Sequence, residues 1–506
     1  MEQLLKKKSV RLSGCALDKQ EECPISGEYS LPDYCPDVAV ILKCFAYPRV
    51  LNRQWSGDQL LVDGNTVLRV LYLDEERKHV HAFEFVQPFT CTMRGAGKAD
   101  NAAVDLELTT KYLNCRAIGP RRVEVRGAVS VAARAECVVQ KDLGIAVEDS
   151  CLFTRTLEKE ITIPCGMNEK VVTISESLDF PDVLPPAEML LGGECRAVIR
   201  DCKLLAGKAI IKGQVFLHQL YVDNKDAVHC LDFVLPFSQI LDVNEAVEGM
   251  PYYATALILS DTERCTAGPS GENTILDVAV KLLLQIRVHK IETTTIIKDA
   301  YHSRCPLTTQ TEGVEMCCFF GTRWEETVLP MRLAAQSGRW QEIIDVCVQP
   351  QEHTTEYIDG SAVVNGRMIV CVVARDVDGE VVYDEFAEEY SLRYECRGNA
   401  CRVSLVPIQC KYRVIENALE LQISLYATVM DMERVCEQVT ADLRLQSDCP
   451  YPPRKVTTLL YYADVGESVW DIGRNCHASP ACIREENALE EEFLTEQRVL
   501  VVPIVN

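Results

Sequence analysis

The sequence predicts a mainly β protein, with three tandem β-sandwich-like repeats followed by a small β-α-α-β domain. Three observations support this prediction. Runs of five to eight Val, Ile, Leu and Tyr residues alternate with polar turns, landmark residues recur about every 149 positions, and the composition changes after Leu445. The predicted segments are an N-terminal arm (1–26), three repeats (27–165, 166–312 and 313–448), a proline-rich linker (449–455) and the last domain (456–506).

The repeats are recognised by two landmarks. A glycine precedes a β-rich run in each copy, at Gly64, Gly213 and Gly366, with spacings of 149 and 153 residues. An apolar residue followed by proline recurs every 149 residues, at Leu31-Pro32, Phe180-Pro181 and Leu329-Pro330. Because the two landmarks agree within a few residues, the three segments are predicted to share one fold.

Each repeat is expected to be an antiparallel sandwich. Residues 123–131 and 419–425 alternate between apolar and polar side chains, which is typical of strands with one solvated face. Strands at this density, joined by short polar turns, favour two packed sheets. A short helical piece is expected from Asp37 to Lys43.

The charge of the chain excludes several classes of function. The formal net charge is −23, so the chain should repel nucleic acid and anionic membranes. The one basic cluster, Lys6-Lys7-Lys8 with Arg11, is interpreted as a solvated arm. No stretch approaches the roughly 18 apolar residues that span a bilayer, and no secretion signal is visible. We therefore expect a cytosolic protein with no nucleic-acid partner and no membrane span.

The 25 cysteines are expected to be mostly reduced and buried, because no C-x-x-C pair occurs and no export signal is present. His81 and His229 occupy matching places in two repeats, but the third repeat has Val382 there, so a metal site is not expected. P-loop, nucleotide-binding, G-x-S-x-G and H-E-x-x-H motifs are missing from the sequence. We therefore predict no catalytic residues, no cofactor and no enzyme activity.

The last domain shows a different pattern. Residues 458–462 and 498–503 are predicted strands, and helices are predicted from Val469 and from Pro480. Ser468 is placed to cap the first helix, and a proline at the start of a helix suits the second. The prolines of the linker interrupt sheet pairing, so we expect this domain to move as a separate unit.

This domain resembles the LysM family. The resemblance rests on Gly466-Glu467-Ser468, the Val469–Ile472 helix start, Asn487-Ala488-Leu489 and the Gln497–Val499 strand start. Glu467 replaces the usual Asp, Glu496 replaces a glycine, and Glu490–Glu492 make the loop acidic. In the LysM fold the 466–468 turn and the 487–489 loop are expected to form one shallow groove that binds a partner or a glycan. The predicted groove residues are Gly466, Glu467, Ser468, Trp470, Asn487, Ala488 and Leu489.

Trp470 has two interpretations. As part of a helix it could pack into the small domain core, or it could be partly exposed and anchor a partner. The sequence leaves both open.

The N-terminal part of the chain resembles the SPOCS module of spore-forming Firmicutes. The resemblance rests on residues 28–38, with the string Leu-Pro-Asp-Tyr-Cys-Pro-Asp, and on Ile41-Leu42-Lys43. Tandem SPOCS modules followed by LysM are similar to a family of spore-coat morphogenetic proteins. The resemblance implies a mother-cell scaffold at the forespore surface. Its partners would be other coat proteins and the basement-layer ATPase of the coat (SpoIVA-like), the latter bound through the LysM domain. The alternative is a cell-wall protein whose LysM domain binds peptidoglycan.

Overall fold

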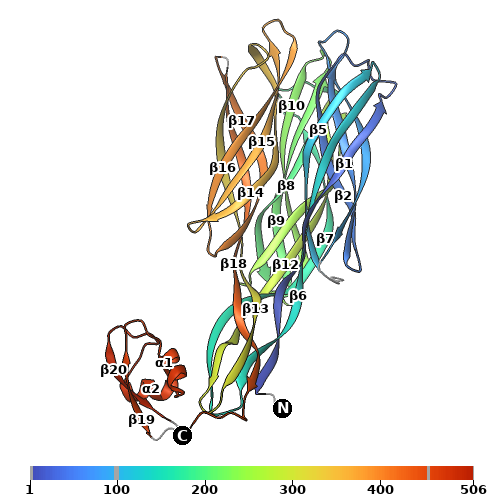
Figure 1. The fold of residues 1–506 in the computed structure, drawn as a ribbon. Coiled ribbons are helices and arrows are strands. Elements are labelled where there is room, and N and C mark those ends of the chain that lie inside the picture. Colours follow the sequence, from blue (N-terminus) through green and yellow to red (C-terminus); the bar gives the residue numbers. More distant parts are fainter. Residues whose placement is uncertain (1–3, 96–101, 417, 453–455, 505–506) are drawn as a thin grey trace.

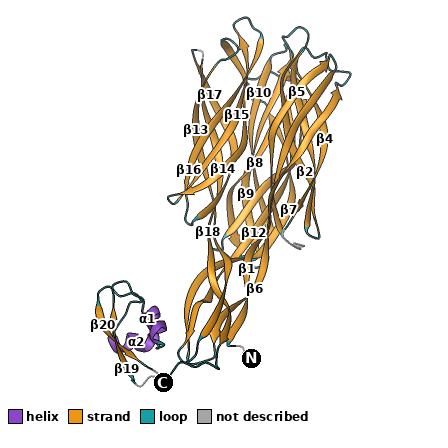
Figure 2. Ribbon diagram, in the orientation of Figure 1, coloured by secondary structure: helices purple, strands orange, loops and turns teal. Residues whose placement is uncertain are grey.

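The computed structural model describes residues 4–95, 102–416, 418–452 and 456–504. Most of this part of the chain is β-strand, and two short helices lie near the C-terminus (Figures 1 and 2). The predicted mainly β fold is confirmed. No helix in these ranges is long and apolar enough to cross a bilayer.

Three modules follow one another along the chain, each with six strands in two antiparallel sheets. In every module the first, sixth and fifth strands form one sheet in that order, and the second, third and fourth form the other. The inward side chains of the two sheets form a separate apolar core in each module. The predicted sandwich and its threefold repetition are therefore confirmed.

The first module contains β1 (Leu5–Ser30), β2 (Val40–Ser56), β3 (Gln59–Leu73), β4 (Val80–Arg94), β5 (Ala103–Gly119) and β6 (Arg122–Val147). The second contains β7 (Leu152–Asp179), β8 (Ala187–Leu205), β9 (Lys208–Asp223), β10 (Val228–Asp242), β11 (Tyr252–Ala267) and β12 (Asn273–His302). The third contains β13 (Leu307–Ala334), β14 (Trp340–Ile358), β15 (Ser361–Asp376), β16 (Val381–Glu395), β17 (Ala400–Ile415) and β18 (Ala418–Leu445).

The module boundaries differ from the predicted ones because the outer strands are unusually long. Residues 5–26, expected to be a solvated arm, form most of β1 and pair with β6. The modules meet in the turns 148–151 and 303–306, whereas the predicted boundaries followed residues 165 and 312. β6 has 26 residues and β7 has 28, against a mean of about 5–6 for strands. The helical piece expected from Asp37 to Lys43 is also wrong, because β2 begins at Val40.

The glycine landmark marks equivalent places in the three modules. Each glycine lies in the central strand of the second sheet, opposite an aromatic residue of the next strand. The pairs are Gly64 with Phe89, Gly213 with Phe237, and Gly366 with Tyr390. A β-carbon on each glycine would lie within 3 Å of its partner's aromatic side chain, so the glycine makes room for that side chain to cross the strand.

The proline landmark marks equivalent places in two modules only. Pro32 and Pro181 follow the ends of β1 and β7, whereas Pro330 lies inside β13 and pairs with Gln422 of β18. The third copy of this landmark is therefore not structurally equivalent to the other two.

The three modules share a stalk, which we define as the ends of β1, β6, β7, β12, β13 and β18 that extend beyond the sandwiches. Figure 1 shows these six strands converging below the three sandwiches. Their side chains meet in one apolar core that includes Leu12, Ile163 and Val314, which are 151 residues apart in sequence. Each module supplies one pair of strands to the stalk, so the three modules are not structurally independent of one another.

A further core joins the second sheets of the modules. It contains Leu71 of β3, Leu220 of β9 and Val373 of β15, together with other buried residues from all three modules. The modules therefore surround a common interior above the stalk. The result is one elongated body.

The 25 cysteines all lie within the described residues, and none of them forms a disulfide. Cys371, for example, is 1% exposed and lies in an apolar core. Burial raises the pKa of the Cys202 thiol to about 12, so it stays protonated at neutral pH.

We expect thiol titration of the denatured chain, without reductant, to find about 25 thiols per molecule. The reason is that none of these cysteines forms a disulfide in the fold and many are shielded from oxidants by burial. A titre several thiols lower in freshly purified protein would reveal disulfides that are incompatible with this structure.

Candidate functional site

The C-terminal domain has the predicted β-α-α-β order. It consists of β19 (Thr458–Ala463), α1 (Val469–Cys476), α2 (Pro480–Asn487) and β20 (Arg498–Pro503), with β19 and β20 paired antiparallel. Ser468 caps α1, because its hydroxyl accepts a hydrogen bond from Trp470 N at 3.1 Å. Proline is the first residue of α2, as predicted. The helices pack on one face of the two strands around a small apolar core.

The predicted turn Gly466–Ser468 is held against the end of the α2–β20 loop. Gly466 N donates to Leu494 O at 2.7 Å, and Leu494 N donates to Glu467 O at 2.9 Å. The Glu467 carboxylate accepts from the Tyr461 hydroxyl at 2.7 Å and from a backbone N–H. Two of the predicted groove residues, Glu467 and the buried Ser468, therefore have structural bonds of their own.

The predicted loop Asn487–Leu489 is tied to β20. The Asn487 side chain donates to Val501 O and accepts from Val501 N, both at 2.7 Å. Ala488 is exposed, and Leu489 packs partly against the domain core. The bonded neighbour of the 466–468 turn is thus the 492–494 segment, and a shared groove with 487–489 stays a prediction.

Trp470 is neither a residue of the domain's own core nor an exposed anchor. It is 5% exposed, and its indole N–H donates to Asp299 of β12 at 2.9 Å. Its ring meets the Tyr301 ring edge-on at a centroid distance of 4.9 Å. The residue that we predicted as a groove member therefore docks the C-terminal domain onto the second module.

Other contacts join the same two surfaces, which we call the docking interface. Arg474 forms an ion pair with Asp299 at 2.8 Å, and the Tyr301 hydroxyl donates to Ala478 O at 2.6 Å. Arg155 of β7 pairs with Glu492 at 2.7 Å. An indole, a guanidinium and a hydroxyl group thus find polar partners across the docking interface.

The linker follows the same surfaces. Tyr451 N donates to Arg304 O at 2.8 Å, and the Tyr451 ring stacks on His477. The structure does not support our expectation of a separately moving domain. Residues 453–455 of the predicted linker lie outside the described ranges.

Two exposed aromatic side chains of this domain were not predicted from the sequence. Tyr462 of β19 is 79% exposed, and Phe493, which bridges to Ser468, is 52% exposed. The signal for Tyr462 was available, because Leu460 and Tyr462 alternate with inward residues along β19. The acidic residues Glu490 and Glu491 lie exposed in the same loop as Phe493.

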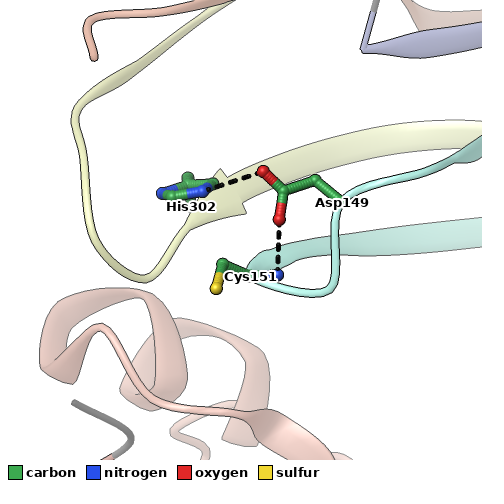
Figure 3. Close-up of side chains that lie close together, drawn as sticks. All are labelled: Asp149, Cys151 and His302. Atoms are coloured by element: carbon green, nitrogen blue, oxygen red, sulfur yellow. Dashed lines mark hydrogen bonds and ion pairs between the residues drawn. The ribbon is translucent and has the colours of Figure 1, made fainter.

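A cluster of Asp149, Cys151 and His302 lies at the stalk tip beside the docked domain (Figure 3). His302 Nδ1 accepts hydrogen bonds from two backbone N–H groups at 3.0 Å, so its proton is on Nε2, which faces Asp149 at 3.2 Å. The other Asp149 oxygen accepts from Cys151 N. The cluster therefore fastens the β6–β7 turn to the end of β12 through hydrogen bonds.

His81 and His229, the histidines at matching places in two repeats, each lie close to a carboxylate. His81 Nε2 lies 3.4 Å from Asp74, and His229 Nε2 lies 3.0 Å from Asp223. Neither belongs to any of the three potential metal-ligand groups found among the described residues.

Comparison with known families gives one match, in two segments. Residues 37–118 and 186–260 match the SPOCS domain of SipL. The segments cover β2–β5 of the first module and the equivalent strands, β8 to most of β11, of the second. No curated protein and no solved structure matches the chain.

The matched parts of the first and second modules are thus similar to the SPOCS domain. In these two segments the chain is SipL-like. The SPOCS resemblance seen in the sequence is confirmed. The LysM resemblance of residues 456–506 stays a prediction.

Proposed function

We propose that this chain is a non-enzymatic scaffold of the spore coat, acting in the mother cell at the forespore surface. The match of two modules to the SPOCS domain of SipL is the observation that carries the proposal. The architecture supports it, because three modules form one elongated body and the C-terminal domain is held at the end of the stalk (Figure 1). A domain held there is accessible to a large partner.

The partner proposed for the C-terminal domain is the basement-layer ATPase of the coat. The proposed contact surface consists of residues of the domain that stay exposed when it is docked. It combines the exposed rings of Tyr462 and Phe493 with the acidic residues Glu490 and Glu491. Aromatic anchors beside polar residues are typical of protein interfaces, and acidic charge favours a basic protein surface over a neutral glycan.

Capture of purified basement-layer ATPase by the full-length chain tests this proposal. We expect Phe493→Ala to weaken capture about tenfold or more, because it removes a ring that would be buried in the complex. Glu491→Lys should weaken capture severalfold at low salt and less at high salt, because screening reduces the charge contribution. Glu75→Lys, in the exposed β3–β4 turn of the first module, is the matched charge-reversal control and should bind like the unaltered chain. Unchanged capture by both test variants would contradict the proposed surface.

The alternative function is a wall-associated protein whose C-terminal domain binds peptidoglycan, and the LysM resemblance favours it. Sedimentation of the same variants with purified peptidoglycan distinguishes the two functions. Strong sedimentation, insensitive to Glu491→Lys and accompanied by no capture of the ATPase, would replace the scaffold proposal with the cell-wall alternative.

A further inference from the structure

The border between the second and third modules contains a cluster of three different metal-ligating side chains. His218 of β9 lies opposite Asp232 of β10, and Cys230 is two residues earlier on β10, on the same face of the sheet. His218 Nδ1 is 2.7 Å from Asp232 Oδ1 and 3.2 Å from Cys230 Sγ. An imidazole nitrogen, a thiol and a carboxylate therefore converge on one point at the sheet surface.

The other nitrogen of His218 is held by the third module. His218 Nε2 lies 2.9 Å from Asp345 Oδ1 of β14, whose side chain is 5% exposed. When a neutral histidine donates the N–H of one ring nitrogen to a carboxylate, its other nitrogen carries no proton. The lone pair of that nitrogen then points away from the carboxylate. This carboxylate–histidine arrangement is the usual support of a histidine that ligates a metal.

From this arrangement we propose that His218, Cys230 and Asp232 bind a zinc ion at the border of the second and third modules. Imidazole, thiolate and carboxylate are the three protein ligand types of zinc, and a thiolate disfavours magnesium and calcium. Water would take the fourth position of a tetrahedral site, because His218 and Asp232 are partly open to solvent.

The distances fit zinc after a small adjustment. Ligand atoms bound to zinc at about 2.0–2.3 Å are about 3.3–3.6 Å apart in a tetrahedron. The His218–Cys230 distance of 3.2 Å is close to this range, and the His218–Asp232 distance of 2.7 Å is short by about half an ångström. Asp232 can make that movement because its side chain is 73% exposed.

The other two potential ligand groups in the described part of the chain lack this arrangement. His302 uses Nδ1 as an acceptor of backbone N–H groups, so zinc at Nε2 would require an imidazolate. The group of Cys195, Asp261 and Glu263 has no imidazole, and Asp261 is already paired with Arg49 at 3.0 Å. These groups serve as internal comparisons for the proposed site.

Zinc binding at this site releases the protons of His218 Nδ1 and of the Cys230 thiol, so the affinity rises with pH. Without the ion, His218 carrying both protons bridges Asp232 and Asp345, which keeps the ligands together. With zinc bound, the hydrogen bond from His218 to Asp345 connects the coordinated residues of the second module to the third module. The site would therefore strengthen the contact between these modules.

Cobalt and zinc titration of the chelator-treated, reduced full-length chain tests the proposal. We expect one equivalent of Co²⁺ to produce a near-ultraviolet thiolate-to-cobalt absorption and tetrahedral visible bands that one equivalent of Zn²⁺ abolishes. Cys230→Ser should lose the thiolate absorption, and His218→Gln should lose the bound equivalent. Cys265→Ser, a partly buried cysteine of the same module, is the control and should behave like the unaltered chain. Asp345→Asn should keep the spectrum but bind zinc about 10–100-fold more weakly.

A second measurement guards against misfolded variants. Zinc should raise the thermal midpoint of the unaltered chain and of Cys265→Ser, and should leave that of Cys230→Ser unchanged. Circular dichroism establishes that the variants are folded. The proposal is overturned if the unaltered chain binds no cobalt, or if Cys230→Ser retains the same absorption and the same zinc-dependent midpoint.

Discussion

Replacing Gly213 with alanine is expected to destabilise the second module by about 3 kcal/mol. A β-carbon there would lie 2.3 Å from the Val198 carbonyl oxygen and 2.3 Å from the Phe237 ring. The carbonyl belongs to a paired strand of the same sheet and cannot withdraw without breaking that sheet's hydrogen bonds. The midpoint of the thermal transition that reports on the second module should fall by roughly 5–10 °C.

Two comparisons isolate the cause. Gly119→Ala adds the same methyl group to β5, where no heavy atom lies within 4 Å, and should change stability by a few tenths of a kcal/mol at most. Gly366→Ala should cost less than Gly213→Ala, because the nearest atoms belong to the Tyr390 and His353 side chains rather than to backbone. Equal changes in stability at positions 119 and 213 would show that the loss of backbone conformational freedom, which both substitutions share, dominates over steric overlap at Gly213.

Trp470→Ala is expected to release the C-terminal domain from the stalk. The change removes the indole hydrogen bond to Asp299, the edge-on contact with Tyr301 and a side chain that is 5% exposed. Removal of a buried tryptophan typically costs about 3–5 kcal/mol, which exceeds what the remaining ion pairs can supply. Limited proteolysis should then cut the 449–455 linker at least tenfold faster than in the unaltered chain.

Variants on the stalk side exclude unfolding of the small domain as the cause. Asp299→Ala removes the acceptor of both Trp470 and Arg474 without touching the domain itself, so it should also accelerate cleavage, to a smaller extent. Trp470→Phe keeps an aromatic ring and should give an intermediate rate. If Asp299→Ala leaves cleavage unchanged while Trp470→Ala accelerates it, the tryptophan stabilises the domain rather than its docking.

The sequence predicted those features that depend on neighbours close along the chain. The starts of the two short helices follow from Ser468 and Pro480, and both residues act within a few positions of themselves. The glycine landmark was informative for a similar reason, since the aromatic partner of Gly64 is the nearby Phe89 on the next strand.

The stalk and the docking interface were not predicted because their contacts join segments that are far apart in the sequence. The start of β1 is polar and charged, and its partner residues in β6 are more than a hundred positions away. Nothing local distinguishes such a strand from a solvated arm. Trp470 likewise finds its acceptor 171 residues earlier, in Asp299. A tryptophan in a short amphipathic helix indicates that it will be buried, but not against which surface.

The shared stalk has a consequence for the order in which the chain folds during synthesis. The first module can close its sandwich once β6 has left the ribosome, but its stalk strands then expose Leu12 and Leu143 to water. Their cover includes Val439 of β18, which is translated about three hundred residues after Leu143. At about 5–20 residues per second, those apolar strands wait many seconds for their last partner. A nascent chain of this kind is a natural client for chaperones, and it would be most prone to aggregation just before β18 emerges.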